Sequence, residues 1–471
     1  MEYTPTIGLE IHAELKTATK MFCNSRNTPE HTRPNEHICP VCMAHPGTLP
    51  VINKEAVRHV LKVGLAVSGT LADYTEFDRK NYFYPDIPKG YQISQYKYPL
   101  VSDGKLAGVQ ITRVHLEEDT ARSTHHTEHS LVDYNRAGVP LMELVTEPVI
   151  KTADEAVYFA KELQILLRSL KASNANMEKG EMRVEANISV SADPKVFGTK
   201  VEVKNLNSFK ALERAIYHEI ARQSEVLRSG GTVIQETRGW DENRETTFSQ
   251  RKKESAHDYR YFPDPDLPKL RVGTVPDFAP HELRAQMGEL PWDRRARYIT
   301  TLGISEEAAE IFVRDAVLGD LFDAVIPYCK GDTVHAQRAA NYISSDLTAL
   351  IRSDEGAGLS RIDPEQFARL MTRIGEGVLS SRGAKNVLVI MYREGGDPMI
   401  IAEREGLIQK NDTDALQAAV RDSIVAHPQV VADYKSGKEA ALQFLVGQGM
   451  KATRGSANPE LLKKIFLQEL A

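Results

Sequence analysis

The 471-residue chain lacks the long apolar run that a membrane-spanning helix requires. Such a helix needs about 20 consecutive apolar residues, and no segment approaches that length. Residues 1–15 also lack the basic start and the apolar stretch of a signal peptide, and they carry three acidic side chains. The four cysteines are too few for a disulfide framework in a chain of this length. These absences predict a soluble protein of the reducing cytoplasm that makes no membrane contact.

The chain also lacks an excess of positive charge, because its formal net charge is −6. Affinity for phosphates depends on nearby Lys and Arg, so a contact with nucleic acid would have to come from local basic patches, shape readout or partner proteins. The composition, with 41% hydrophobic and 26% charged residues, is typical of a globular protein. The length predicts two to four domains.

Several common catalytic motifs are missing as well. The sequence contains neither the phosphate-binding loop Gly-x4-Gly-Lys-Ser/Thr nor the signature set of protein kinases. It has no Gly-x-Ser-x-Gly elbow, no Gly/Ser-rich amidase signature and no N-terminal catalytic cysteine. A covalent hydrolase or a self-contained glutaminase is therefore not predicted, and any use of ATP requires an unusual site.

Residues 1–292 alternate between strand and helix patterns without a regular βαβ order. Apolar and polar residues alternate over residues 6–15, 182–190 and 200–204, which predicts strands, and residues 232–252 resemble a hairpin. A capping box at Thr152 and Glu155 begins a helix that runs to about residue 170, and a second helix spans about residues 208–227. This region is predicted to be an α+β catalytic domain with a mixed or antiparallel sheet.

Strand patterns stop after Pro291. Residues 293–395 contain short amphipathic helix patterns and end at the chain-breaking sequence GGDP. Residues 396–471 are helical again, with a polar loop expected at residues 447–459. The sequence therefore predicts three domains: the α+β domain (1–292), an all-α helical domain (293–395) and a C-terminal helical tail domain (396–471).

The first predicted strand carries Glu10, His12 and Glu14 on one face. A second strand presents Glu185 and Asn187 with the same spacing, and the segment HLEED at residues 115–119 adds further acids. Divalent cations such as Mg²⁺ favour oxygen ligands from several elements, often together with substrate phosphates. The pattern indicates a metal site, and the alternative is the solvated face of an edge strand.

The segment FDRKNYFYPDIPKG at residues 77–90 places Arg79 and Lys80 among aromatic residues. A similar density of charge and aromatic rings recurs at residues 257–266. Both segments fit either a turn packed by aromatic side chains or a loop that contacts nucleotide phosphates.

Cys23, Cys39 and Cys42 follow the spacing C-x15-C-x2-C, which is close to a zinc ribbon but one thiolate short. A redox role is disfavoured because no thioredoxin-like βαβ unit surrounds the CxxC pair. Cys329 is expected to be an ordinary core or surface residue. The candidates for a fourth zinc ligand are His31, His37 and His45.

Six motifs in this order closely resemble the GatB family, which comprises one of the subunits of the aspartyl/glutamyl-tRNA(Asn/Gln) amidotransferases. The motifs are TIGLEIH (6–12), FDRKNYFYPD (77–86), HLEED (115–119), DYNRAGVPLME (133–143), EVKNLNS (202–208) and DYRYFPD (258–264). The resemblance continues through GMKATRGSANP (449–459) and so covers essentially the whole chain.

The resemblance implies a division of labour within a heterotrimer. The GatB chain would phosphorylate the side-chain carboxylate of Glu-tRNA(Gln) or Asp-tRNA(Asn) with ATP. The glutaminase subunit, GatA, would supply ammonia through a channel, and the ammonia would displace phosphate to give the amide. The small GatC subunit would tether the assembly. Which of the two tRNA substrates is used stays open at this point.

The resemblance also assigns residues. Glu10, His12 and Glu118 are carried over as lining the Mg²⁺ and ATP site, with Glu143 and Glu185 as further magnesium ligands and Glu14 as a solvated neighbour. Charge and strand face add Lys80, Arg183 and Lys204 as phosphate contacts. The full set of expected catalytic residues is Glu10, His12, Glu118 and Lys80, and the expected ATP-binding residues are Arg79, Lys80, Arg183, Lys204 and Asn205.

Two positions depart from the family pattern. Ser25 stands where zinc-bearing relatives usually have a second cysteine, so a zinc site would be degraded, completed by a histidine, or empty. Val184 and Glu185 replace the commoner Cys-Asp pair, and Glu is one methylene longer.

The C-terminal region resembles a tail domain that grips the outer corner of tRNA in this family. A solvated helix end is the alternative for its basic residues. Two other functions also stay open: a non-catalytic tRNA-binding scaffold derived from the enzyme, and an ATP-dependent ligase acting on a free amino acid, against which the long helical tail argues. The residues expected to contact tRNA are Lys451, Arg454, Lys463 and Lys464.

Overall fold

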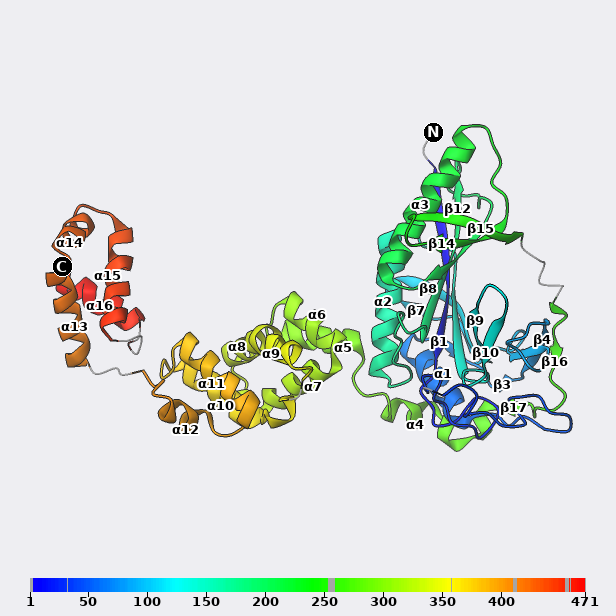
Figure 1. The fold of residues 1–471 in the computed structure, drawn as a ribbon, viewed down its shortest axis with the longest axis horizontal. Coiled ribbons are helices and arrows are strands. Elements are labelled where there is room, and N and C mark those ends of the chain that lie inside the picture. The colour runs from blue at the N-terminus through cyan, green and yellow to red at the C-terminus, as the bar shows by residue number, and fades with distance from the viewer. Residues whose placement is uncertain are drawn as a thin grey trace. The chain divides into compact units, whose positions relative to one another are not determined.

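The computed structural model describes residues 3–31, 33–252, 259–356, 358–409, 413–453, 457 and 459–470. The chain forms two compact units, Met1–Pro291 and Trp292–Ala471, which are coloured blue to green and green to red in Figure 1. Among the described residues, helices long and apolar enough to cross a bilayer do not occur.

A ten-stranded sheet is the centre of the N-terminal unit. Its strands are β1 (Thr4–Glu14), β2 (Thr70–Leu71), β6 (Val101–Ser102), β7 (Lys105–Leu106), β8 (Val109–Glu118), β11 (Pro140–Thr146), β12 (Met182–Ser191), β13 (Val201–Leu206), β14 (Glu236–Asp241) and β15 (Thr246–Lys252). They lie in the order β15-β14-β13-β12-β1-β11-β8-β6-β2, and β7 pairs with β8. The β13–β14 pair is parallel and its neighbours are antiparallel. The predicted α+β fold with a mixed sheet is therefore confirmed.

The two faces of the sheet differ in polarity. Helices α2 (Ala153–Ser169) and α3 (Phe209–Arg228) pack against the main sheet (Figure 1). Ile7, Leu9 and Ile11 of β1 are at most 1% exposed. Burying each such side chain stabilises the fold by about 1.5–3 kcal/mol. The alternate residues, Glu10 and His12, point to the other face. The apolar half of the strand therefore fixes its register and directs the polar half away from the core.

Both predicted helix starts are confirmed by their caps. The Thr152 hydroxyl accepts the backbone N–H of Glu155 at 3.1 Å, and the Glu155 carboxylate accepts the N–H of Lys151 at 2.8 Å. Ser208 caps α3 by accepting the N–H of Ala211 at 3.0 Å. These bonds satisfy N–H groups that have no partner inside the helix.

Short strands outside the main sheet position the aromatic segments. β4 (Asp78–Asn81) and β5 (Tyr91–Ser94) form a hairpin from residues 77–94, and β16 (Phe262–Pro263) pairs with β4. The two basic and aromatic segments of the sequence therefore lie side by side.

The remaining helices and strands of this unit are α1 (Lys54–Ala66), β3 (Tyr74–Thr75), β9 (Arg122–His125), β10 (Ser130–Asp133), β17 (Leu270–Arg271) and α4 (Pro280–Ala285). The predicted hairpin at residues 232–252 is confirmed as β14 and β15.

The described part of the C-terminal unit is helical. The predicted all-α character is confirmed, and the division at residue 396 stays a prediction. The helices are α5 (Pro291–Ala296), α6 (Glu306–Arg314), α7 (Ala316–Val325), α8 (Thr333–Tyr342), α9 (Thr348–Ser353), α10 (Pro364–Gly375), α11 (Ser381–Glu394), α12 (Pro398–Arg404), α13 (Thr413–Ala426), α14 (Pro428–Lys435), α15 (Glu439–Ala452) and α16 (Pro459–Leu470).

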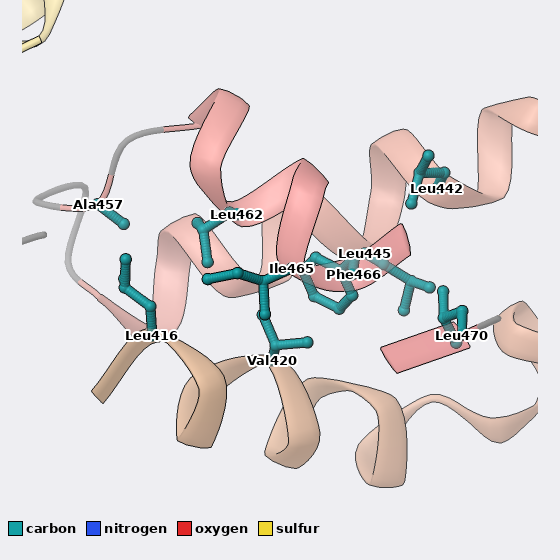
Figure 2. Close-up of a cluster of buried hydrophobic side chains, with 9 residues drawn as sticks. All are labelled: Leu416, Val420, Leu442, Leu445, Ala457, Leu462, Ile465, Phe466 and Leu470. Carbon is teal, nitrogen blue, oxygen red and sulfur yellow. The ribbon is translucent and has the colours of Figure 1, made fainter. Parts of the chain in front are cut away.

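An apolar cluster holds α13, α15 and α16 together (Figure 2). Gly449 lies where α15 meets α16, and a Cβ there would stand 3.1 Å from the Phe466 ring. The close packing explains why α15 continues to Ala452, so the expectation of a polar loop from residue 447 was wrong for its first six positions. The cluster consists of Leu416, Val420, Leu442, Leu445, Ala457, Leu462, Ile465, Phe466 and Leu470.

Candidate active site

A cleft of about 490 Å³ lies on the polar face of the main sheet. Strands β1, β8, β11, β12 and β13 supply its floor, and β4 supplies Lys80. It brings together seven of the predicted residues: Glu10, His12, Lys80, Glu143, Arg183, Glu185 and Lys204. Its further charged residues are Glu117, Asp119 and Glu202, which were not among the predicted site residues.

His12, Glu117 and Glu143 form the first group in the cleft, with ligand atoms within 4.8 Å of one another. His12 Nε2 lies 3.3 Å from Glu143 Oε2 and 3.6 Å from Glu117 Oε1. The strand register produces this group, because His12 stands opposite Glu143 and Glu143 stands opposite His115 on β8. Two carboxylates and one imidazole offer donor atoms that suit a divalent cation.

Strong electrostatic coupling marks this first group. Burial lowers the pKa of His12, but Glu143 and Glu117 outweigh burial and raise it to about 9. Burial and then Glu143 raise the pKa of Glu117 to about 7. The Glu143 carboxyl has a lowered pKa because His115, His12 and Lys80 outweigh its burial. The protonated His12 therefore offsets one of the two carboxylates of the group, and a bound metal ion would replace that positive charge.

Glu10, Glu185 and Glu202 form a second group, again with oxygen atoms within 4.8 Å. Lys204 balances it: its Nζ lies 2.7 Å from Glu185 Oε2 and 3.8 Å from Glu202 Oε1. Burial lowers the pKa of Lys204, but Glu185 and Glu202 raise it overall. Asn187 donates a hydrogen bond to Glu10 at 2.8 Å. This group therefore carries its own ammonium counter-charge.

Arg183 also lines the cleft. Its guanidinium donates to Asp119 Oδ2 at 2.8 Å, and Arg136 lies 3.8 Å from the same oxygen. Burial and then Asp119 raise the pKa of Glu14 to about 8. The expectation that Glu14 is simply solvated was wrong, because its carboxyl lies against Asp119 rather than in open water.

Lys80 reaches the cleft from the β4–β5 hairpin. Its Nζ lies 5.0 Å from the centre of the Tyr259 ring. Burial lowers its pKa, but Tyr261, Glu117 and Glu143 raise it overall, so Lys80 is a cation.

Glu118 does not lie in the cleft, so its predicted position beside Glu10 and His12 was wrong. Consecutive residues of a strand point to opposite faces, and Glu117 takes the cleft side of β8. Glu118 instead pairs with Lys89 at 2.6 Å and accepts the backbone N–H of Ile93 at 2.9 Å. The sequence held a signal for this choice. His115 and Glu117 are two residues apart on β8 and so share a face, and His115 stands opposite Glu143, so Glu117 rather than Glu118 faces the cleft.

Arg79 also lies away from the cleft, for the same reason. It alternates with Lys80 on β4 and binds Asp264 at 2.8 Å and Asp266 at 2.9 Å. Its guanidinium stacks 4.3 Å above the Tyr91 ring. Arg79 therefore holds the segment around β16 onto β4.

Asn205 is likewise not among the residues that line the cleft. Its side chain is exposed and its backbone has a φ of 64°. The lining of the cleft therefore gives no support to the expected direct contact of Asn205 with ATP, which stays a prediction.

The three cysteines predicted to bind zinc do gather, with sulfur atoms within 4.8 Å of one another. Ser25 Oγ and Lys20 Nζ lie 3.8 Å and 3.9 Å from Cys42 Sγ. A hydrogen bond from Cys23 and, less strongly, the charge of Lys20 lower the pKa of Cys42 to about 4, although burial opposes this. The thiol donors fit a soft metal such as zinc, and Ser25 takes the place of a fourth thiolate.

The candidate histidine ligands differ in position. His31 and His37 stack on each other with ring centres 4.2 Å apart, and His31 binds Glu36 at 2.7 Å. His45 lines a pocket of about 190 Å³ together with Cys23 and Cys42. Cys329 is buried in the C-terminal unit.

The predicted tRNA-binding lysines lie on the C-terminal tail. Lys451 lies on α15, and Lys463 and Lys464 lie on α16; all three are exposed. Within the described residues none of them forms an ion pair. Arg454 lies outside the described residues.

Comparison with known proteins agrees with this arrangement. Residues 5–275 match the GatB/GatE catalytic domain, and residues 320–470 match the GatB domain. The chain is 44% identical to the corresponding aspartyl/glutamyl-tRNA(Asn/Gln) amidotransferase subunits of Carboxydothermus hydrogenoformans and Herpetosiphon aurantiacus, in each case over 100% of this chain and 99% of the relative. It is 42% identical to the subunit of Thermoanaerobacter pseudethanolicus over 100% of both chains. The chain therefore belongs to the GatB family of aspartyl/glutamyl-tRNA(Asn/Gln) amidotransferase subunits.

Proposed function

We propose that the chain uses ATP to phosphorylate the side-chain carboxylate of Glu-tRNA(Gln), Asp-tRNA(Asn) or both, and then completes amidation with ammonia from the glutaminase GatA. The observation that carries this proposal is the cleft, where carboxylates, an imidazole and three cations meet on one face of the sheet. A carboxylate is a poor electrophile, and phosphorylation gives it a good leaving group. Ammonia then forms the amide bond as phosphate leaves, which yields Gln-tRNA(Gln) or Asn-tRNA(Asn).

Magnesium fits the first group of the cleft. His12, Glu117 and Glu143 would hold it, with Glu10 and Glu185 of the second group close by. When bound, Mg²⁺ would neutralise phosphate charge and polarise the transferring phosphoryl group. The chemistry of the donor set supports this assignment, since hard cations favour carboxylate oxygen.

The cations of the cleft would bind and orient ATP phosphates. Lys80, Arg183 and Lys204 approach from three different strands, and the ion pairs of Arg183 and Lys204 hold their side chains in place. Preorganised cations stabilise charge that develops during phosphoryl transfer. The reaction needs no side-chain nucleophile, which agrees with the missing nucleophile motifs.

Alanine at His12 or Glu10 tests the proposal in a complex reconstituted with GatA and GatC. We expect ATP-dependent amidation of Glu-tRNA(Gln) and Asp-tRNA(Asn) to be abolished, while glutamine hydrolysis by GatA continues. Normal amidation by either variant would overturn the metal assignment. No amidation by the complex in the presence of ATP, with tRNA still bound, would favour the scaffold alternative, and amidation of free glutamate would favour the free amino acid ligase.

The proposal includes partners and a location. The glutaminase GatA and the tethering protein GatC, together with tRNA(Gln) or tRNA(Asn), are the expected partners, and the cytoplasm is the expected compartment. The tail would bind tRNA through Lys451, Lys463 and Lys464. Truncation after about residue 400 should weaken tRNA binding, and an unchanged tRNA affinity would count against this role.

Zinc at Cys23, Cys39 and Cys42 is a separate part of the proposal. Metal analysis of the purified chain tests it, and less than about 0.2 zinc per chain would reject it. The variant Ser25→Cys supplies a fourth thiolate and serves as the matched comparison. We expect it to bind close to one zinc per chain and to melt at a higher temperature in zinc than after chelation.

A further inference from the structure

The pairing of β12 with β13 changes register beside the cleft. Ala186 stands opposite Val203, but Val184 stands opposite Leu206. Two residues of β13, Lys204 and Asn205, therefore face the single residue Glu185. This arrangement is a β-bulge, which bends a strand and redirects its side chains.

The bulge changes the phase of the strand's alternation. In a regular strand, residues 202, 204 and 206 would share one face and residue 205 would face the core opposite Val184. The extra residue instead turns Leu206 into the core, where it and Val184 are 2% and 1% exposed. Glu202 and Lys204 stay in the cleft. One short strand can therefore supply a cleft lysine and, two residues later, a core leucine.

Asn205 supplies the backbone conformation that this bulge requires. Its φ of 64° lies in the left-handed region, where the Cβ of most residues approaches a carbonyl oxygen too closely. Glycine avoids this contact, and asparagine tolerates it better than β-branched residues do. Because the Asn205 side chain is exposed and does not line the cleft, its backbone conformation, rather than a side-chain contact, is what the site uses.

We propose that Asn205 is a positioning residue for the ATP-dependent step. Its left-handed conformation sustains the bulge that aims Lys204 at Glu185, with Nζ 2.7 Å from Oε2, and so directs the ammonium into the cleft. The inference rests on the proposed function, in which Lys204 contacts ATP phosphate.

Four variants of the reconstituted complex test this inference: Asn205→Gly, Asn205→Val, Lys204→Met, and Lys204→Met combined with Asn205→Val. We expect Asn205→Gly to keep the KM for ATP and the kcat within about twofold of the parent, because glycine adopts the same backbone conformation. Asn205→Val should raise the KM for ATP at least about tenfold, because a β-branched residue at positive φ is strained. The double variant should be no worse than Lys204→Met alone, because Asn205 acts through Lys204.

Lys330 provides the matched control. It is also exposed and left-handed, with a φ of 51°, but it lies in the C-terminal unit. Lys330→Val should lower the melting temperature as Asn205→Val does, without changing the KM for ATP. If Asn205→Val does not fold, Asn205→Ala carries the same test with a smaller side chain.

The outcomes separate the two claims. Full activity of Lys204→Met would overturn the proposed role of Lys204 and the inference together. An impaired Lys204→Met with a normal Asn205→Val would overturn the positioning role alone. A loss in Asn205→Gly equal to that in Asn205→Val would also overturn it, because the side chain rather than the conformation would then matter.

Discussion

The cleft of the N-terminal unit and the tail of the C-terminal unit present positive charge in opposite ways. In the cleft, Arg183 is paired with Asp119 and Lys204 with Glu185, and both ion pairs are partly buried. On the tail, Lys463 and Lys464 are exposed, and within the described residues they form no ion pair. The cleft is proposed to bind ATP phosphates and the reacting end of the aminoacylated tRNA, and the tail is proposed to bind the same tRNA elsewhere. The two arrangements of charge therefore reflect different tasks.

Paired, buried cations are held in one geometry and are weakly screened by salt, which suits contacts with a reacting group. Exposed, unpaired lysines attract a phosphate backbone over a longer range and without fixed geometry. The comparison predicts that changes in the cleft alter rate and metal dependence, whereas changes in the tail alter tRNA affinity.

Breaking the tail core gives the largest expected effect. Phe466 is fully buried in the cluster of Figure 2, so Phe466→Ala should destabilise the tail by about 3–5 kcal/mol. We expect the Kd for tRNA to rise, with kcat at saturating tRNA unchanged. Thermal melting and filter binding measure the two quantities.

Leu467 is the control for this prediction because it neighbours Phe466 on α16 but is 41% exposed. Leu467→Ala should change the melting temperature and the Kd for tRNA far less. A large fall in kcat for Phe466→Ala at saturating tRNA would break the separation between tail and cleft.

The adjacent acids of β8 give the next effect. Glu117→Gln should lower kcat by about 100-fold and raise the Mg²⁺ concentration for half-maximal amidation, because Glu117 belongs to the proposed metal group. Glu118→Gln removes one carboxylate charge at the next residue, but Glu118 points to Lys89. It should therefore leave the half-maximal Mg²⁺ concentration unchanged, whatever it does to stability or rate. A shift of that concentration in Glu118→Gln would contradict the assignment of faces.

Sequence patterns predicted the strands better than the direction of individual side chains. The alternation of residues 6–15 placed Glu10 and His12 correctly, because the apolar partners of β1 are strictly buried. Glu118 follows the cleft residue Glu117, and Arg79 precedes the cleft residue Lys80. Both were misplaced because a motif alone does not say which of two neighbouring residues faces the site.

Features that depend on pairing between distant segments could not be predicted. The second group needs the register of β1, β12 and β13, and the bulge at Asn205 appears only when β12 and β13 are aligned. The exposure of Lys463 and Lys464 could be predicted, because the apolar residues of α16 define a face that excludes both lysines. Their role rests on the family resemblance rather than on a pattern of their own.

Metal binding in the cleft should depend on pH more steeply than tRNA binding by the tail. The raised pKa of His12, about 9, means that its imidazole is protonated at neutral pH in the metal-free protein. Because a metal ion must displace that proton, metal affinity should increase by about tenfold per pH unit between about pH 7 and pH 9 and level off above pH 9. Below about pH 7 it should change more steeply, because Glu117 must then also lose a proton. Calorimetric titration with Mg²⁺ or Mn²⁺ measures this slope, and His12→Gln should reduce it. An affinity that falls as pH rises would contradict the proposed ligand.

The tail lysines give the smallest and most selective effect. Replacing Lys463 and Lys464 with methionine should leave kcat at saturating tRNA unchanged and reduce the slope of log K against log salt by roughly 2, one for each lost phosphate contact. Lys438→Met is the matched control, because Lys438 lies on the same tail but is paired with Asp433 at 3.0 Å. Its removal should leave the salt slope unchanged. If Lys438→Met and the double variant alter the salt slope equally, a lysine without an ion pair contacts tRNA no more than a paired one. The contrast between the tail and the paired cations of the cleft would then fail.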